Sequence, residues 1–449
     1  MKTKRSIVTF LLVGLMIFSV ACSSNSNSSN SSNNNQSNSS AKSNNTKGET
    51  KKPVTLKVLM NTEWIEGRKL QFFIDAYEEE TGNKLDVQSV PDGQYSNLVN
   101  TRLATRDLPD VLFYWGEGAK GALLQPEKNF AELTDEEMIT RVVSVVKDDL
   151  AAMGQGKIYG LPVTTLNVTG IIYNKDVFAE HQIEIPHTHE ELLAAAEKLK
   201  TAGVTPFYDA GKDAWPLQVY TLGAFSNIIK KQPDVLDKIN TNQLKFTDLP
   251  EYEKMLAAQL EIHEKGYTNS DLFSATYDMS IEQVATGKSA MIVNADWAIP
   301  IILERFPNAP IGMFPVPWDG EGDNYTGYLP PIVAYAIKDS KNEAAAVEFL
   351  RFIADPDRQN EYNNLIKGIP SFSGVEAELN PGTAEMYTLL EQGNARVSFN
   401  SGVRYTFPDY EFLMQDLYGG KKTPAEVAQV VQQRMEETAK NAGAAEFTN

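Results

Sequence analysis

The chain has 449 residues and carries 59 acidic side chains against 41 lysines and arginines, a formal net charge of −18. Such an excess of negative charge repels phosphate backbones and anionic lipid, which argues against nucleic acid as a partner. The single cysteine excludes disulfides within the chain and thiolate metal sites, and we expect neither a metal nor a cofactor.

The first 22 residues are typical of a secretory signal, because a basic start precedes an apolar run over residues 7–18. That run is too short to span a membrane. Cys22 follows a small-residue cleavage site directly and resembles the lipidated cysteine of a bacterial lipobox. Ser19 stands where leucine is usual, so cleavage near Ala21 that leaves a free thiol stays an alternative. We predict that residues 1–22 are a lipoprotein signal and that Cys22 carries the lipid, including palmitate.

Residues 23–52 are rich in serine and asparagine and contain almost no apolar side chain. Such a segment cannot bury enough surface to offset its ordering entropy, so we predict a disordered tether. Its length favours attachment by the lipid anchor alone to the extracellular face of a Gram-positive cell membrane. The remaining chain is long enough for two lobes, each with its own core.

After the tether, strand and helix patterns alternate. They predict strands over 54–60, 85–90 and 109–115, with helices over 70–82 and 99–103 between them. This order is typical of the start of a doubly wound α/β lobe. Because ligands bind beyond the carboxyl ends of the strands in such sheets, residues 61–64 and 114–117 are candidate binding segments.

Two short apolar runs, 158–162 and 170–174, flank a polar interval and indicate a chain crossing between lobes. A helix is expected to begin at Thr188, whose spacing to Glu191 matches a capping box. Residues 311–317 are expected to form a return crossing. The remaining patterns predict helices over 187–203, 252–266, 280–287, 342–353 and 423–435, and strands over 204–208, 290–293 and 332–337.

Several of these segments carry a family resemblance. K-I-Y-G-L-P followed by I-I-Y-N-K-D-V-F, the strand P-D-V-L-F-Y-W, the turn N-A-D-W and the helix K-N-E-A-A-A-V-E-F-L-R-F resemble the extracellular (family 1) solute-binding proteins of carbohydrate ABC transporters, which are maltose-binding-protein-like. The resemblance covers nearly all of residues 54–442. It implies a type II periplasmic-binding-protein-like α/β fold with two discontinuous lobes, a hinge and a central cleft. The implied lobes are residues 53–164 with 315–355, and residues 165–314 with 356–449.

A sugar offers hydroxyls for planar hydrogen-bond partners and C–H faces for aromatic rings, so its site requires tryptophan or tyrosine beside polar side chains. The five tryptophans of this chain have such neighbours and lie in predicted loops, although each is equally well explained as a core or rim residue. The resemblance adds Asn167 in the crossing and a late loop with Arg404 and Tyr405. The predicted ligand-binding residues are Glu63, Trp64, Tyr114, Trp115, Glu117, Asn167, Asp213, Trp215, Asp296, Trp297 and Arg404.

The resemblance implies a monomeric substrate-binding lipoprotein that captures a neutral sugar and delivers it to ABC transporter permease subunits. The number of loop aromatics favours an oligosaccharide. A surface carbohydrate-active enzyme is the alternative, with a carboxylate pair drawn from Glu63, Glu66, Glu117 and Asp296. A third reading keeps the fold but changes the ligand to a peptide, polyol or anion. His187 and His189 are two residues apart on a helix and face away from each other, so they do not form a metal pair.

Overall fold

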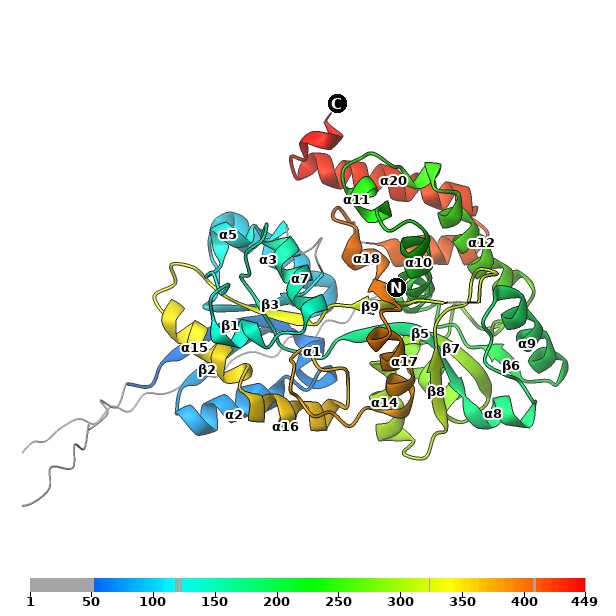
Figure 1. Ribbon diagram of the computed structural model, residues 1–449, viewed down its shortest axis with the longest axis horizontal. Coiled ribbons are helices and arrows are strands. Elements are labelled where there is room, and N and C mark those ends of the chain that lie inside the picture. Colours follow the sequence, from blue (N-terminus) through cyan, green and yellow to red (C-terminus); the bar gives the residue numbers. More distant parts are fainter. Residues whose placement is uncertain (1–51, 118–120, 122, 323, 407–408, 449) are drawn as a thin grey trace, which may run out of the picture. The chain divides into compact units, whose positions relative to one another are not determined.

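Two β-sheets organise the computed structural model, which describes residues 52–448 apart from 118–120, 122, 323 and 407–408 (Figure 1). The predicted signal, Cys22 and all of the predicted tether except Lys52 therefore lie outside the described residues. The two sheets, each with its own covering helices, are described below as the first and second lobe.

The first sheet has the strand order β2 (Lys84–Val90), β1 (Thr55–Asn61), β3 (Val111–Trp115), β10 (Ile332–Ala336), β4 (Leu161–Pro162). Strand β1 is parallel to β2 and β3, whereas β10 is antiparallel to β3 and β4. The side chains of β3 are buried at all but its last position, as expected for a central strand covered on both faces. The carboxyl ends of β1 and β3 therefore open at the same edge, where α1 (Thr62–Gly67) begins.

Helices cover both faces of the first sheet (Figure 1). The apolar stripe of α2 packs against two helices from late in the chain: the ring of Tyr77 lies 4.7 Å from that of Phe349, and Phe73 lies 4.8 Å from Tyr362. Gly82 ends α2 with a φ of 70°, which confirms the predicted stop. The helices of this lobe are α2 (Gln71–Thr81), α3 (Asp92–Thr105), α5 (Pro126–Asn129), α6 (Glu137–Thr140), α7 (Ser144–Met153), α15 (Glu343–Ile353) and α16 (Pro356–Ile366).

The second sheet has the order β11 (Ala395–Val397), β9 (Thr326–Leu329), β5 (Asn167–Asn174), β7 (Ser289–Ala295), β6 (Thr205–Phe207), and β8 (Ile311–Phe314) also pairs with β5. All eight residues of β5 are buried, so it is the central strand of this lobe. Strand β5 is antiparallel to β7, β8 and β9, and β6 is parallel to β7. The carboxyl ends of β6 and β7 therefore lie at the same edge as the start of β5.

The second lobe contains most of the helices. Helix α10 (Val219–Lys231) is buried along nearly its whole length, and the ring of its Phe225 packs on Tyr252 of α12 and Phe399 of α18. The other elements are α8 (Lys175–Glu180), α9 (His189–Thr201), η1 (Trp215–Gln218), α11 (Val235–Asn240), η2 (Phe246–Asp248), α12 (Pro250–Glu264), α13 (Tyr277–Ala285), α14 (Ala298–Arg305), α17 (Pro381–Glu391), α18 (Phe399–Gly402), α19 (Tyr410–Tyr418), α20 (Pro424–Asn441) and η3 (Ala445–Phe447).

Three segments connect the two sheets, and hydrogen bonds join these segments to one another. They run from β4 to β5, from β9 to β10, and from α16 to α17. The Val163 N–H donates to the Ile332 carbonyl over 2.8 Å, and the Leu166 N–H donates to the Ile369 carbonyl over 2.9 Å. The hydroxyl of Ser371 donates to the Thr164 carbonyl. In the first crossing, Val163 therefore bonds to the start of β10, and Thr164 and Leu166 bond to the segment between α16 and α17.

Sheet membership differs in two places from the predicted lobe limits. Strand β9 pairs with β5 and β11 in the second sheet, although residues 315–355 are predicted to belong to the first lobe. Helix α16 contacts α2 through Tyr362, although residues 356–449 are predicted to belong to the second. The lobe limits themselves remain a prediction. Among the described residues, no helix is both long and apolar enough to cross a membrane.

Candidate functional site

Four aromatic residues gather where β1 and β3 end, and we call them the first-lobe aromatic group: Trp64, Tyr95, Tyr114 and Trp115. The ring of Trp64 meets Trp115 edge-on at 5.0 Å, and Tyr114 meets Trp115 edge-on at 4.9 Å. Tyr95 of α3 lies behind them, fully buried, and its hydroxyl donates to the carbonyls of β1 and β3. It therefore holds together the ends of β1 and β3, which lead to Trp64 and carry Tyr114 and Trp115.

Two predicted carboxylates accompany this group. Glu63 is exposed in the first turn of α1, and its N–H donates to the Asn61 side chain that caps the helix. Glu117 follows β3 and is 8 % exposed. The Glu63 side chain is therefore open to solvent, whereas the Glu117 side chain is largely buried.

The corresponding edge of the second sheet carries Trp215, Tyr277 and Trp297, the second-lobe aromatic group. The ring of Trp215 meets Tyr277 edge-on at 4.8 Å and lies 6.2 Å from Trp297. Trp215 and Trp297 are both partly exposed. Asp213 accepts a hydrogen bond of 2.6 Å from the Tyr277 N–H at the start of α13. This predicted ligand residue therefore also positions the tyrosine.

A polar chain connects the two lobes beside these rings. The guanidinium of Arg68, at the end of α1, donates to Asn167 Oδ1 over 2.9 Å. The Asn167 amide in turn donates to Asp296 Oδ1 over 3.0 Å, and so does the Val168 N–H. The Arg68 guanidinium also lies 5.3 Å from the centre of the Trp297 ring. Asn167, Asp296 and Trp297, predicted from separate segments, are thus brought together.

Burial dominates the electrostatics of this chain. It raises the pKa of Asp296 to about 6, although the hydrogen bonds from Val168 and Asn167 and the positive charge of Arg68 all oppose the shift. Burial also lowers the pKa of Arg68, against the influence of Tyr362, Asp296 and Tyr277. Burial thus disfavours the charged form of both groups, while the Asn167 amide between them hydrogen-bonds to each.

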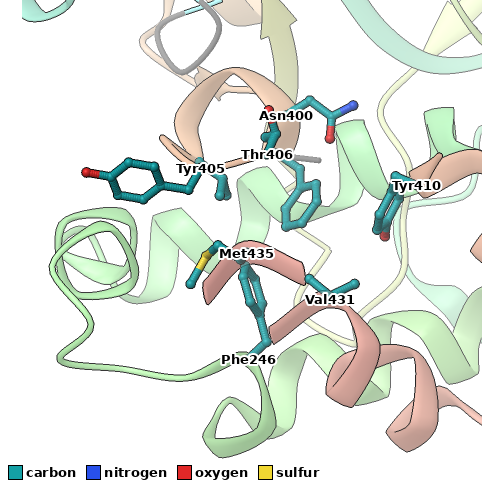
Figure 2. Close-up of a pocket in the computed structure, with 9 residues that line it drawn as sticks. Phe246, Asn400, Tyr405, Thr406, Tyr410, Val431 and Met435 are labelled. Carbon is teal, nitrogen blue, oxygen red and sulfur yellow. The ribbon is translucent and has the colours of Figure 1, made fainter. Parts of the chain in front are cut away.

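Arg404 lies elsewhere in the second lobe. Its side chain is exposed, and its N–H donates to Asn240 of α11. The neighbouring Tyr405 packs on Phe447 near the end of the chain and lines a small cavity of about 10 Å³ (Figure 2). A cavity of that size holds about one water molecule, so it is too small for a sugar. Its other lining residues are Phe246, Phe399, Asn400, Val403, Thr406, Tyr410, Val431 and Met435.

A model of the family described as bacterial extracellular solute-binding protein matches residues 73–390. The chain belongs to this family. Proteins of this family bind solutes and are not enzymes. The predicted hydrolase alternative is therefore wrong.

Three relatives illustrate the similarity. The multiple sugar-binding protein of Streptococcus mutans is 24% identical over 65% of this chain and 69% of its own. The melibiose/raffinose/stachyose-binding protein MelE of Bacillus subtilis is 24% identical over 73% of this chain and 76% of its own. The solved structure of SBP RafE in complex with raffinose is 22% identical and superposes with a TM-score of 0.70 over 85% of this chain and 99% of that one. The superposition confirms the predicted two-lobed α/β fold.

Two further predictions about side chains are explained by local contacts. Trp318 is buried in the core of the second lobe, where its indole N–H donates to the Ala224 carbonyl, as the core reading predicts. The ring of His189 contacts the Glu261 carboxylate, and Thr188 caps α9 as predicted. Among the described residues no cluster of histidine, cysteine, aspartate and glutamate fits a metal ion.

The sequence reasoning missed Arg68, Tyr95 and Tyr277. Arg68 follows Trp64 by four residues, a spacing that places both on one side of a short helix and was a usable signal. Tyr95 and Tyr277 give no such signal, because their partners come from strands and loops distant in the sequence. Whether any of the predicted residues contacts a sugar stays a prediction.

Proposed function

We propose that this protein is the substrate-binding component of a carbohydrate ABC importer and that it captures a neutral oligosaccharide between its two lobes. The observation that carries the proposal is the pairing of an aromatic group on each lobe with the polar chain between them. The relatives support it, because one is a multiple sugar-binding protein, one is a melibiose/raffinose/stachyose-binding protein, and a third was solved in complex with raffinose.

The physical basis of capture is stacking and hydrogen bonding from both sides. Partly exposed indoles such as Trp115, Trp215 and Trp297 offer flat faces to sugar C–H groups, and each stacked ring contributes on the order of 1 kcal/mol. Carboxylate and amide groups such as Glu63 and Asn167 distinguish hydroxyl orientations. Since both lobes contact the ligand only when they are close together, sugar binding favours the closed form.

The proposal includes the remaining predictions about location and partners. The lipid on Cys22 anchors the protein to the extracellular face of the cell membrane, and residues 23–52 act as the tether. The closed, sugar-loaded form is delivered to the permease subunits. The family's extracellular character agrees with this location. The acidic net charge agrees with a neutral ligand.

Isothermal titration calorimetry of the chain from residue 23 onward tests the proposal. The panel consists of melibiose, raffinose, stachyose and malto-oligosaccharides, with sugar phosphates, peptides and polyols as the other classes. We expect heat with at least one neutral oligosaccharide, and we expect Trp297→Ala to weaken that binding. Phe273→Ala is the matched control, because Phe273 is an exposed aromatic residue of the second lobe outside both aromatic groups. Binding confined to a phosphate, peptide or polyol would overturn the neutral-sugar assignment.

A further inference from the structure

Arg68 makes its side-chain contacts with the lobe to which it does not belong. Its backbone is part of the first lobe: its N–H donates to the Trp64 carbonyl over 3.1 Å, and its carbonyl accepts from the Tyr362 hydroxyl over 2.9 Å. Its guanidinium contacts Asn167 and Trp297, which follow or begin strands of the second sheet. Moving the lobes apart as rigid bodies therefore breaks both side-chain contacts.

These contacts are partly shielded from water, which makes them stronger than a surface pair. Arg68 is only partly exposed, and the carboxylate of Asp296 lies one amide away with 2 % exposure. Hydrogen bonds to a charged group and cation–π contacts both strengthen when water is excluded. The adjacent residue provides the contrast. Lys69 reaches Glu304 of the second lobe at 3.8 Å, but both side chains are well exposed, so this ion pair is weak.

We propose that Arg68 is a positioning residue that stabilises the closed form of the protein and thereby sets its sugar affinity without contacting the sugar. The inference rests on the proposed function, since it assigns a role in the same binding site. In the closed form Arg68 fixes the Asn167 amide and the Trp297 ring. In the open form it loses both partners.

This role has a quantitative signature. If the sugar binds tightly only to the closed form, the apparent Kd equals the Kd of that form divided by the closed fraction in sugar-free protein. A substitution that only weakens the contact between the lobes lowers the closed fraction. While the open form predominates, the apparent Kd and the open-to-closed ratio must then rise by the same factor, whichever sugar is used.

The experiment measures both quantities in the same variants. Because Cys22 is the single cysteine, the chain from residue 23 accepts Asp107→Cys and Glu180→Cys, one in each lobe, as its only spin-labelled positions. Pulsed electron paramagnetic resonance then gives the distribution of distances between the lobes without sugar, and calorimetry gives Kd. Arg68→Gln removes the charge, Arg68→Lys retains it, and Lys69→Ala is the matched control.

We expect Arg68→Gln to raise Kd about tenfold and the open-to-closed ratio by the same factor, with partial recovery in Arg68→Lys and no change in Lys69→Ala. A rise in Kd without a change in the sugar-free distribution would assign Arg68 to direct sugar contact and overturn the inference. Unchanged Kd and distribution would overturn it equally. If the wild-type chain binds no sugar, the proposed function fails, while the distance distributions still decide whether Arg68 joins the lobes.

Discussion

Replacing Asp149 by asparagine should make the protein more stable at neutral pH but not in acid. Asp149 lies on α7 of the first lobe, and its Oδ2 accepts a 3.2 Å hydrogen bond from the Tyr328 hydroxyl on β9 of the second sheet. Burial raises the pKa of Asp149 to about 7 from an ordinary value of 3.8; the Tyr328 hydrogen bond opposes this shift, and the Asp148 carboxylate adds to it.

The size and sign of the effect follow from proton linkage. The folded protein holds the Asp149 proton up to about pH 7, whereas the unfolded chain releases it near pH 4, so stability falls as the pH rises between these values. The loss is roughly 1.4 kcal/mol per pH unit, about 4 kcal/mol in all, and it levels off above pH 7. Asparagine keeps an acceptor oxygen for Tyr328 and has no proton to lose. The free energy of unfolding of Asp149→Asn relative to wild type should therefore increase between about pH 4 and pH 7.

Urea unfolding of wild type and Asp149→Asn at intervals from pH 4 to 8 measures this difference. Asp107→Asn is the control, because Asp107 is an exposed carboxylate of the same lobe and is not among the groups that shift the pKa of Asp149. A stability difference between Asp149→Asn and wild type that stays constant across the pH range would refute the reasoning. The reasoning would also fail if Asp107→Asn gained the same pH-dependent stability over wild type as Asp149→Asn.

Three further predictions concern single contacts. Gly170→Ala should destabilise the second lobe by about 1–3 kcal/mol in urea unfolding, because the new Cβ would lie 2.4 Å from the Phe314 carbonyl oxygen; Gly67→Ala, with open space around it, should have little effect. Thr188→Ala should lower the free energy of unfolding by about 1 kcal/mol, because it removes the capping box of α9; an unchanged unfolding midpoint would contradict this. Asp213→Ala should weaken sugar binding by about 1 kcal/mol in calorimetry by releasing the Tyr277 N–H, whereas an unchanged Kd would show that Tyr277 is held without it.

Features set by neighbouring residues were predictable from the sequence. The capping box at Thr188 forms as its spacing predicts, because its hydrogen bonds span only three residues, and the predicted final helix begins with a second capping box at Thr423. Helix α2 ends at Gly82 for an equally local reason. The start of α13 was predicted wrongly at Ser280. Thr276 caps it instead, since its side chain accepts from the Met279 N–H, and two polar residues four apart gave competing signals.

Features set by tertiary contacts were predictable only in part. The strand expected over 170–174 begins earlier, at Asn167, because pairing with β9 extends it into the polar interval. Helix α3 runs over Asp92–Thr105, far beyond the expected 99–103, because its small and polar residues give no clear apolar stripe. Four of the five tryptophans lie in the two aromatic groups, whereas Trp318 is in the core of the second lobe. The contact of Arg68 with Trp297 could not be predicted, because it joins residues of different lobes that are distant in the sequence.

The pairing of β3 with β10 has a consequence for how the chain folds as it is made. Trp115 lies opposite Ile332, and Val111 opposite Ala336. The edge of β3 that faces β10 therefore has no partner until the elements from α8 to β9 have left the ribosome. Pairing between such distant segments forms slowly, because a long loop must close first. Through most of synthesis the nascent chain therefore lacks a complete sheet. A polypeptide whose sheet is still incomplete can pass through a narrow secretion channel.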